Sequence, residues 1–448
     1  MLGFLRWLAH PGRIAPVAYL VGWAVGTGLL MSPAASETGR PTGFWEAGFT
    51  AMSALCITGL AVVDTAGHWS TFGELTILGL IQVGGLGIMT LGSLVVFSVS
   101  RRRASLAQLD AALVETRART RQGLRRIPIR IISLSLAFEL VFALVLTLRL
   151  RAYLPDWGTA AYHGVFHAVS AFNNAGFALQ PDSLVRFNAD PFIMVPISLA
   201  VVLGGLGFPV YLELGRRMLG HGSAFWSVHL RLTLWGTLVL LVLGFLTFVA
   251  FEWNNPATLG GQGVDGKVLG ALGGAVFPRT AGFNSIDYAL ASDQTIAINF
   301  GLMLIGGGSA GTAGGLKVTT IAVLLLAVST EVRGHEKTVF GSRKISSAVT
   351  RQALAVTVLG TLAVFAGILG VSLLGGAPLR ESTFEVISAF GTVGLSMNLT
   401  PTLPPAAWAV LMGLMYVGRV GPVSVAAALA MSTRHRHYEL PREDPLVG

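Results

Sequence analysis

Four short segments of this 448-residue chain resemble one another and share a glycine. They are Ser53-Ala-Leu-Cys-Ile-Thr-Gly59-Leu60, Ser170-Ala-Phe-Asn-Asn-Ala-Gly176-Phe177, Phe277-Pro-Arg-Thr-Ala-Gly282-Phe283 and Ser388-Ala-Phe-Gly-Thr-Val-Gly394-Leu395. They recur about every 110 residues, and each follows an apolar stretch too short to cross a membrane. Because glycine reaches positive φ freely, such a loop can aim successive carbonyl groups at one axis. Carbonyl oxygens arranged in this way can replace the hydration shell of a cation.

A second glycine site follows each segment. Gly84-Gly85-Leu86-Gly87 and Gly204-Gly205-Leu206-Gly207 are nearly identical, and Gly306-Gly307-Gly308 and Gly418-Arg419-Val420-Gly421 stand at the corresponding places. A single such glycine is usually a packing position, because small residues are common where membrane helices meet. Four in register instead predict four repeated units, each with a span, a half-helix, a glycine loop and a second span with a glycine hinge.

The composition places these units in a membrane. Only 12% of the residues are charged and 53% are hydrophobic, whereas about 25% are charged in soluble domains. Eight stretches nearly free of charge are about as long as a membrane span: 14–36, 75–100, 131–148, 191–212, 232–251, 294–330, 352–379 and 386–433. We therefore predict an all-α membrane protein with eight transmembrane helices around a pseudo-fourfold pore.

The repeat divides the chain into four pore units and a cytoplasmic tail. The units are 1–100 with its loop near 57–60, 101–213 with its loop near 174–177, 214–330 with its loop near 280–283, and 331–433 with its loop near 392–396. The C-terminal tail is 434–448.

The charged residues that give the net charge of +9 are unevenly distributed along the chain. Lys and Arg gather near both termini and in alternate inter-span segments, at 101–130, 216–217, 333–351 and 434–442, and the other segments are weighted toward Asp and Glu. Since Lys and Arg mark cytoplasmic loops, both termini should lie inside, and the acidic outer face should concentrate cations. This distribution argues against nucleic-acid binding, and a single cysteine excludes a disulfide framework.

The fourth loop, Thr392-Val393-Gly394-Leu395-Ser396, resembles the Thr-Val-Gly-Tyr-Gly filter strand of potassium channels, with only its first glycine retained. Over nearly its whole length the chain resembles the Trk/Ktr/HKT superfamily of potassium transporters, and most of all the membrane subunits of bacterial Ktr systems. The residues that carry the resemblance are 53–64, 82–89, 170–177, 277–287, 306–320, 388–401 and 415–422. The third unit departs at Val276-Phe277-Pro278, where Pro278 should end the half-helix.

This resemblance implies potassium uptake through a gated pore in a bacterial cytoplasmic membrane. No nucleophile–base set and no paired carboxylates appear in the sequence, so we expect no enzyme activity. The implied selectivity filter consists of backbone carbonyls at Ile57, Thr58, Gly59, Asn174, Ala175, Gly176, Thr280, Ala281, Gly282, Thr392, Val393 and Gly394. Potassium is the expected transported ion and sodium an activator, with no transition metal and no organic cofactor. The implied partners are a second copy of the chain, a cytosolic ring of nucleotide-binding regulatory subunits, and membrane lipid.

A glycine-rich stretch interrupts the apolar run 294–330. Its six glycines cannot form a stable helix, because each costs about 1 kcal/mol relative to alanine. The resemblance implies an intramembrane gate below the filter, formed by Gly306, Gly307, Gly308, Ser309, Gly311, Thr312, Gly314, Gly315, Lys317 and Arg419. We expect little packing to hold this loop. A phosphate-binding loop is rejected, because Leu316 separates Gly315 from Lys317 and no strand precedes it.

Several polar residues in apolar surroundings have alternative interpretations. Arg419, the only charge of the run 386–433, is either a positive barrier in the pore, a member of an ion pair or a snorkelling side chain. For Glu139 we favour a helix-packing hydrogen bond over ion coordination. Asn173 and Asn174 either offer an oxygen to the ion or brace their loop. His163 and His167 have the spacing of a metal pair, but no third ligand is near, so packing is favoured.

Two broader alternatives remain. A secondary carrier that works by alternating access usually rests on inverted repeats, whereas these four units run in the same sense, which favours a pore. The basic loops 101–130 and 331–351 either dock the regulatory partner or contact anionic lipid.

Overall fold

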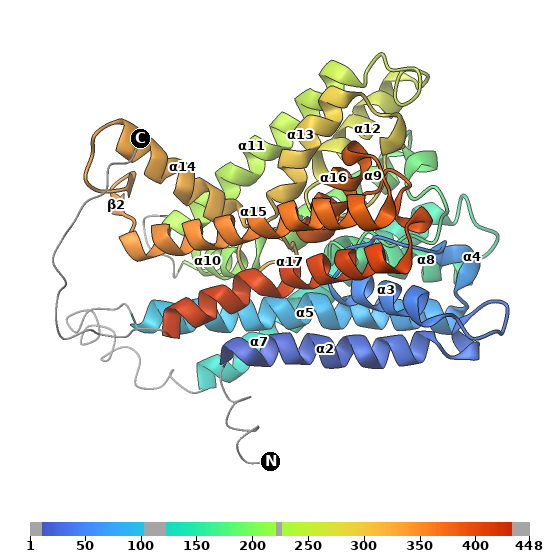
Figure 1. Ribbon diagram of the computed structural model, residues 1–448, viewed down its shortest axis with the longest axis horizontal. Coiled ribbons are helices and arrows are strands. Elements are labelled where there is room, and N and C mark those ends of the chain that lie inside the picture. The colour runs from blue at the N-terminus through green and yellow to red at the C-terminus, as the bar shows by residue number, and fades with distance from the viewer. Residues whose placement is uncertain (1–10, 103–121, 221–225, 432–448) are drawn as a thin grey trace.

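The computed structural model describes residues 11–102, 122–220 and 226–431. The described chain is mostly helical, and the strands in these ranges form one short hairpin of β1 (Val339–Phe340) and β2 (Arg343–Lys344). Long helices run side by side along the long axis of the molecule, and shorter helices lie among them toward one end (Figure 1).

The helices follow the order expected from the repeat. The first half of the chain contains α2 (Pro11–Leu30), η1 (Pro33–Ala35), α3 (Phe44–Leu55), α4 (Thr65–His68), α5 (Thr71–Arg102), α7 (Gln122–Leu150), α8 (Trp157–Phe172), η2 (Val185–Phe187), α9 (Pro191–Leu206) and α10 (Phe208–Met218). The second half contains α11 (Val228–Phe251), α12 (Val264–Val276), η3 (Tyr288–Leu290), α13 (Asp293–Leu304), α14 (Val318–Val332), α15 (Ser347–Gly375), α16 (Leu379–Gly391), η4 (Thr400–Thr402) and α17 (Pro405–Met431). The half-helices α3, α8, α12 and α16 are 12, 16, 13 and 13 residues long. Each leads into one of the four glycine loops, as predicted.

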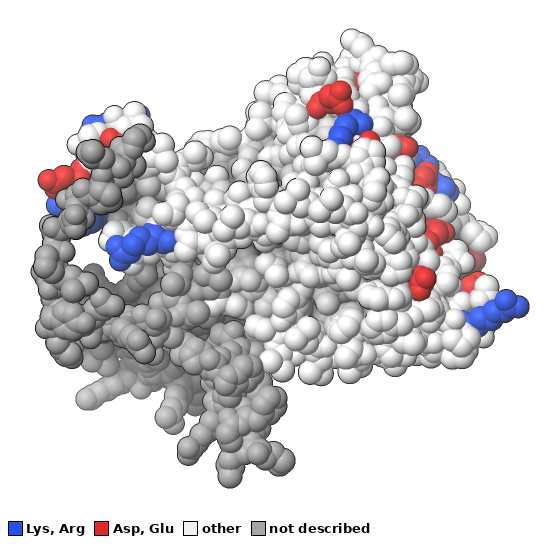
Figure 2. Space-filling view, in the orientation of Figure 1, with Lys and Arg blue, Asp and Glu red and all other residues white. Residues whose placement is uncertain are grey.

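Several helices could cross a lipid bilayer. Within the described ranges, Pro128–Leu150, Val228–Phe251 and Ser347–Gly375 are long and apolar enough to cross a membrane. A fourth span results if α9 and α10, bent by 94°, are taken together, and Pro16–Leu30, Thr71–Gly87 and Val318–Val332 are shorter apolar helices. On the face in Figure 2, charged side chains gather near the left end and along the upper and right edges, and the surface between them is uncharged. These features are those of a multi-pass membrane protein, and the number of eight spans stays a prediction.

The expected glycine hinge occurs in units 2 and 3 only. Gly207 (φ 94°) separates α9 from α10, and residues 305–317 separate α13 from α14. In units 1 and 4, α5 and α17 continue through Gly84 and Gly418, so the prediction of a hinge is wrong there. A Cβ atom at Gly84, Gly204 or Gly418 would collide with the carbonyl group of Leu55, Phe172 or Phe390, respectively, at the end of the half-helix of the same unit. These glycines therefore allow a span to pack directly on its half-helix.

A buried carboxylate, Glu252, ties the loop that follows α11 to the start of α13. It accepts hydrogen bonds from Thr258 Oγ1 (2.6 Å), from Asn255 Nδ2 (2.8 Å) and from the Ser292 hydroxyl (2.7 Å) and backbone N–H (3.0 Å). Burial raises the pKa of this carboxyl group, but the hydrogen bonds to its charged form outweigh burial and hold the pKa below its ordinary value. Glu252 therefore stabilises the fold as a carboxylate.

Glu252→Gln should lower the stability of the detergent-solubilised protein by about 1–3 kcal/mol at neutral pH, because the amide cannot accept all these hydrogen bonds. The stability gained from a lowered pKa is present above the unfolded-state pKa and is lost as the pH falls through the folded-state pKa. The deficit of the variant should therefore shrink toward acid pH. Thermal unfolding at neutral and acid pH measures this, with exposed Glu336→Gln as the matched control. A deficit independent of pH would contradict the assignment.

Candidate functional site

The four glycine loops share one backbone conformation. The glycines have positive φ, at Gly59 (92°), Gly176 (72°), Gly282 (72°) and Gly394 (97°). The residues two positions earlier are also left-handed, at Ile57 (49°), Asn174 (59°), Thr280 (66°) and Thr392 (49°). This conformation is common for asparagine but costs β-branched residues about 1–3 kcal/mol. All four loops contain this left-handed residue, so the conformation is a shared feature of the site.

Each of the four loops, numbered 1 to 4 in chain order, is anchored to its own half-helix. In loops 1, 2 and 4 the backbone N–H groups of Thr58, Ala175 and Val393 donate over 2.8 Å to the carbonyl groups of Ser53, Ser170 and Ser388, respectively. The hydroxyl groups of Ser53 and Ser388 also accept from the N–H groups of Gly59 and Gly394 over 3.1 Å. The hydroxyl of Ser170 instead donates to Phe177 O over 2.7 Å. The serine that recurs in the sequence therefore fixes the loop that follows it.

The third loop departs from this pattern, as predicted. Its half-helix α12 ends at Val276, just before Pro278, and no serine stands at that position. Ala281 N–H therefore donates to Phe277 O (3.0 Å) instead. Phe277 and Phe283 pack edge to face behind the loop, with their ring centroids 5.7 Å apart. The left-handed positions are nevertheless the same as in the other loops.

The four loops contact one another in a closed cycle. A Cβ atom on Gly59 would lie closer than 3.0 Å to a carbonyl oxygen of loop 2. Cβ atoms on Gly176, Gly282 and Gly394 would likewise lie closer than 3.0 Å to carbonyl oxygens of loops 3, 4 and 1, respectively. The oxygens concerned belong to Ala175, Ala281, Val393 and Thr58. Main chain therefore meets main chain around the whole ring, and only glycine fits at these positions. The structure thus brings the predicted filter residues together.

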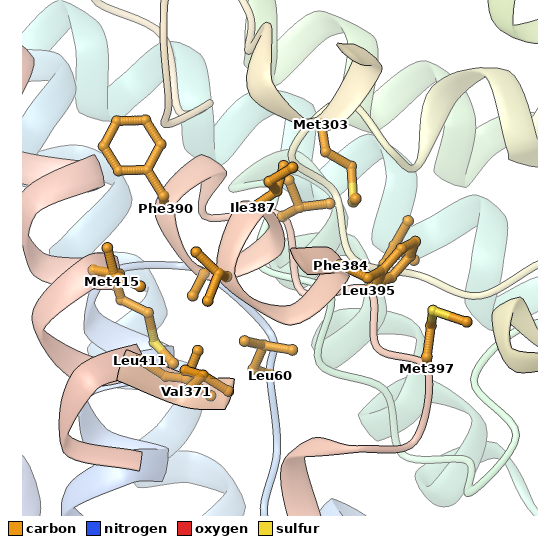
Figure 3. Close-up of a cluster of buried hydrophobic side chains, with 14 of the residues drawn as sticks. Leu60, Met303, Val371, Phe384, Ile387, Phe390, Leu395, Met397, Leu411 and Met415 are labelled. Carbon is orange, nitrogen blue, oxygen red and sulfur yellow. The ribbon is translucent and has the colours of Figure 1, made fainter. Parts of the chain in front are cut away.

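Apolar side chains support the ring from behind. Around loop 4, Phe384 of α16 and Leu395 of the loop belong to one buried cluster with Leu411 of α17 and Met303 of α13 (Figure 3). Phe177 and Phe283, which follow their loop glycines, are 2% and 0% exposed. The prediction that these two rings pack behind their loops is confirmed.

Residues 306–317, the predicted gate loop, are packed firmly. Gly308 N–H donates to Gly205 O (2.8 Å), Thr312 N–H donates to Gly204 O (3.2 Å), and Phe208 N–H donates to Ala310 O (3.2 Å). The expectation of little packing is therefore wrong, because the loop is fastened to the second glycine site of unit 2. The sequence prediction missed this pairing of two glycine-rich stretches, since it depends on tertiary structure.

Two cations hold the same loop through its carbonyl groups. Arg419, which is 2% exposed, donates to Thr312 O and to Gly84 O (3.4 Å). Lys317 donates to Ala313 O and to Gly314 O (3.5 Å). None of the salt bridges in the described ranges includes Arg419, so the ion-pair interpretation fails there. The predicted gate residues therefore lie together, and Arg419 joins them from α17.

A third buried cation, Arg279 of loop 3, was missed in the sequence. It is 6% exposed, its Nη2 donates to Gly306 O (3.4 Å), and its Nε has no hydrogen-bond partner among the described residues. It lines a small cavity together with Asn174, Thr237 and Gly307. Arg279 could have been singled out in the sequence, because it is a charged residue in loop 3 and the other three loops contain none.

Glu139 forms the helix-packing hydrogen bonds that were favoured for it. Its carboxylate is 4% exposed and accepts from Gln82 Nε2 (2.9 Å) and Asn173 Nδ2 (3.0 Å). This network joins α5, α7 and the end of α8. The neighbouring Asn174 donates through Nδ2 to Thr280 Oγ1 (3.4 Å) and accepts a hydrogen bond through Oδ1 from Thr312. Both asparagine side chains therefore brace their loop.

The histidine pair is also accounted for by packing. His167 is 3% exposed, and its Nδ1 forms a hydrogen bond with His163 O (2.8 Å). In the part of the chain that the structure describes, no group of three His, Cys, Asp or Glu residues could hold a metal ion.

Membrane helices that enclose four half-helices and a closed ring of glycine loops define an integral membrane transport protein. A family model described as TrkH, cation transport protein, matches residues 22–437. The chain belongs to this TrkH family of cation transport proteins, a family of transporters and not of enzymes.

The chain is similar to proteins from several bacteria. The chain is 37% identical to the Ktr system potassium uptake protein B of Bacillus subtilis, over 99% of this chain and 98% of that protein. It is 31% identical to the potassium/sodium uptake protein NtpJ of Enterococcus hirae, over 98% and 97% of the two chains. The crystal structure of the potassium transporter TrkH from Vibrio parahaemolyticus superposes with a TM-score of 0.72 over 94% of this chain and 84% of that chain, at 17% identity. That structure supports the fold.

Proposed function

We propose that this protein carries potassium into a bacterial cell through a gated, cation-selective pore in the cytoplasmic membrane. The observation that carries the proposal is the closed ring of four loops with the same pair of left-handed residues. Main-chain carbonyl groups in such a ring can replace the hydration shell of a cation. The relatives from Bacillus subtilis and Vibrio alginolyticus, both named as potassium uptake proteins, support potassium as the ion.

In this proposal each of the four units supplies one quarter of the filter. The units are 1–100, 101–213, 214–330 and 331–433, and their carbonyl groups at 57–59, 174–176, 280–282 and 392–394 coordinate the ion. The gate loop and Arg419 lie below the ring on the cytoplasmic side. Buried Glu385 of α16 accepts hydrogen bonds from Met397 N–H (3.0 Å) and Thr400 Oγ1 (2.6 Å) and so anchors the segment that follows loop 4. An inside-negative potential drives entry by about 2.3 kcal/mol per charge per 100 mV.

A flux measurement in reconstituted vesicles separates this pore from a coupled carrier. A pore gives a potassium current that reverses at the potassium equilibrium potential. A carrier reverses at a potential set by a fixed stoichiometry of two gradients. A reversal potential that shifts with the sodium gradient at constant potassium would overturn the proposal of a passive pore.

The proposed assembly is a homodimer with a cytosolic ring of nucleotide-binding regulatory subunits, with sodium as an activator and both termini in the cytoplasm. The basic segments 101–130 and 331–351 form its docking face. Residues 103–121 and the tail 434–448 lie outside the described residues, whereas the β1–β2 hairpin lies in the second segment. The relatives named as Ktr system proteins B and D support a multi-component system.

Pull-down of the tagged protein from its native membrane should recover a soluble nucleotide-binding protein. Reversing the charge of exposed Arg343 and Lys344 should reduce this recovery severalfold, because it replaces attraction by repulsion at the docking face. Reversing Arg186 and Lys267, on the opposite side of the membrane in this proposal, is the matched control. Unchanged potassium uptake in cells that lack every such soluble protein would contradict the regulatory role.

A further inference from the structure

The gate loop contacts three of the four filter loops at the same position of the repeat. A Cβ atom on Gly306 would touch Thr280 Cγ2 (3.4 Å), and one on Gly314 would collide with the Thr392 side chain. Thr312 Oγ1 donates to Asn174 Oδ1 (3.1 Å). Thr280, Thr392 and Asn174 are the left-handed residues that precede the ring glycines. The fourth, Ile57, packs in an apolar cluster instead.

Thr312 makes the most specific of these contacts. Its hydroxyl group also lies 3.3 Å from Phe172 O, at the end of half-helix α8, and its N–H donates to Gly204 O (3.2 Å). Arg419 donates to the carbonyl group of the same residue. Thr312 is 0% exposed and Asn174 is 1% exposed, so bulk water does not reach the hydrogen bond between them. Asn174 Nδ2 extends the connection to Thr280 of loop 3.

We propose that Thr312 is a positioning residue for ion selectivity: its hydroxyl group holds the Asn174 side chain and thereby fixes the carbonyl groups of filter loops 2 and 3. The inference rests on the proposed potassium pore. Asn174 must keep a left-handed backbone at φ 59° for Ala175 O and Gly176 to face their neighbours. A side chain fastened at both ends maintains that conformation.

Thr312→Val tests this role, because valine keeps the shape of threonine and removes the hydroxyl group. We expect the potassium-to-sodium permeability ratio in vesicles to fall about fivefold, the factor that corresponds to about 1 kcal/mol for one buried hydrogen bond. Thr312→Ser restores the donor and should restore the ratio. The matched control is Thr247→Val in α11, a buried threonine whose hydroxyl bonds only Leu243 O of its own helix.

Asn174→Gly gives a second variant, since glycine accepts the left-handed backbone and removes the side chain, and it should lower the ratio in the same way. Ion-dependent thermal stability provides a readout without flux, because an ion bound in the filter stabilises the folded protein. Potassium should raise the unfolding temperature of the unmodified protein more than sodium does, and this difference should shrink in both variants.

The outcomes separate the two proposals. If the unmodified protein shows neither potassium-selective flux nor potassium-specific stabilisation, the proposed pore fails and this inference fails with it. If the unmodified protein is selective, and Thr312→Val and Asn174→Gly keep both its permeability ratio and its potassium-specific stabilisation, the pore stands and the positioning role is overturned.

Discussion

Deleting residues 307–315 should raise potassium flux by at least about tenfold, which corresponds to about 1.4 kcal/mol of barrier. The loop contacts three of the four filter loops and is fastened by backbone hydrogen bonds to Gly204 and Gly205 (3.2 and 2.8 Å). Each such bond contributes about 0.5–1.5 kcal/mol, so the two together hold the closed form by about 1–3 kcal/mol. Without the loop this barrier is absent. Single-channel or vesicle recordings measure the change.

The same deletion should weaken the dependence of flux on the regulatory partner, because a partner acts by its different affinity for the open and closed forms. It also removes Thr312, so the potassium-to-sodium ratio should fall together with the rise in flux. Arg419→Ala should raise flux severalfold, less than the deletion, and Arg419→Lys, which keeps the positive charge, is the control. A folded deletion variant that conducts no faster than the parent would mean that the gate lies elsewhere.

Gly59→Ser should lower the preference for potassium over sodium by at least about tenfold, or about 1.4 kcal/mol of difference between the ions. Gly59 has φ 92°, and a Cβ atom there would lie 3.2 Å from Gly176 Cα and closer still to Ala175 O. The serine side chain must therefore push loops 1 and 2 apart or abandon the left-handed backbone. Either response moves carbonyl oxygens away from the ion.

Two further variants separate the causes in this experiment. Gly59→Ala brings the same Cβ atom without a hydroxyl group, so a similar loss of preference identifies crowding of the main chain as the reason. Gly413→Ser is the matched control, because a Cβ atom at this exposed helical glycine meets nothing within 4 Å. Reversal potentials in mixed potassium and sodium solutions give the ratios. Equal permeability to the two ions in the unmodified protein would refute potassium selectivity outright.

Much of the architecture could be predicted from glycine spacing. The loops at Gly59, Gly176, Gly282 and Gly394 follow half-helices, and the run 294–330 is broken where its glycines cluster. These features depend on local backbone chemistry, because glycine both permits positive φ and disfavours helix. The different anchoring of loop 3 could be predicted in the same way, from Pro278 and from the absence of the serine that the other loops share.

Other features depend on contacts between distant segments. The sequence gives no local reason for a left-handed backbone at Ile57 or Thr392, since β-branched residues avoid it. Gly84 and Gly418 were predicted to be hinges but pack against half-helices, a distinction that only the neighbouring main chain decides. The bond from Thr312 to Asn174 joins residues 138 positions apart. Such pairings cannot be predicted from periodicity or composition.

The most direct test of the central claim is the position of bound ions. We expect crystals grown in rubidium or thallium salts to show anomalous density on the axis of the ring, between the carbonyl groups of Thr58, Ala175, Ala281 and Val393. Sodium at the same concentration should give weaker or no density there. Well-ordered rings with an empty axis, and with the heavy cation bound in the cavity beside Asn174 and Gly307 instead, would contradict a potassium filter formed by these four loops.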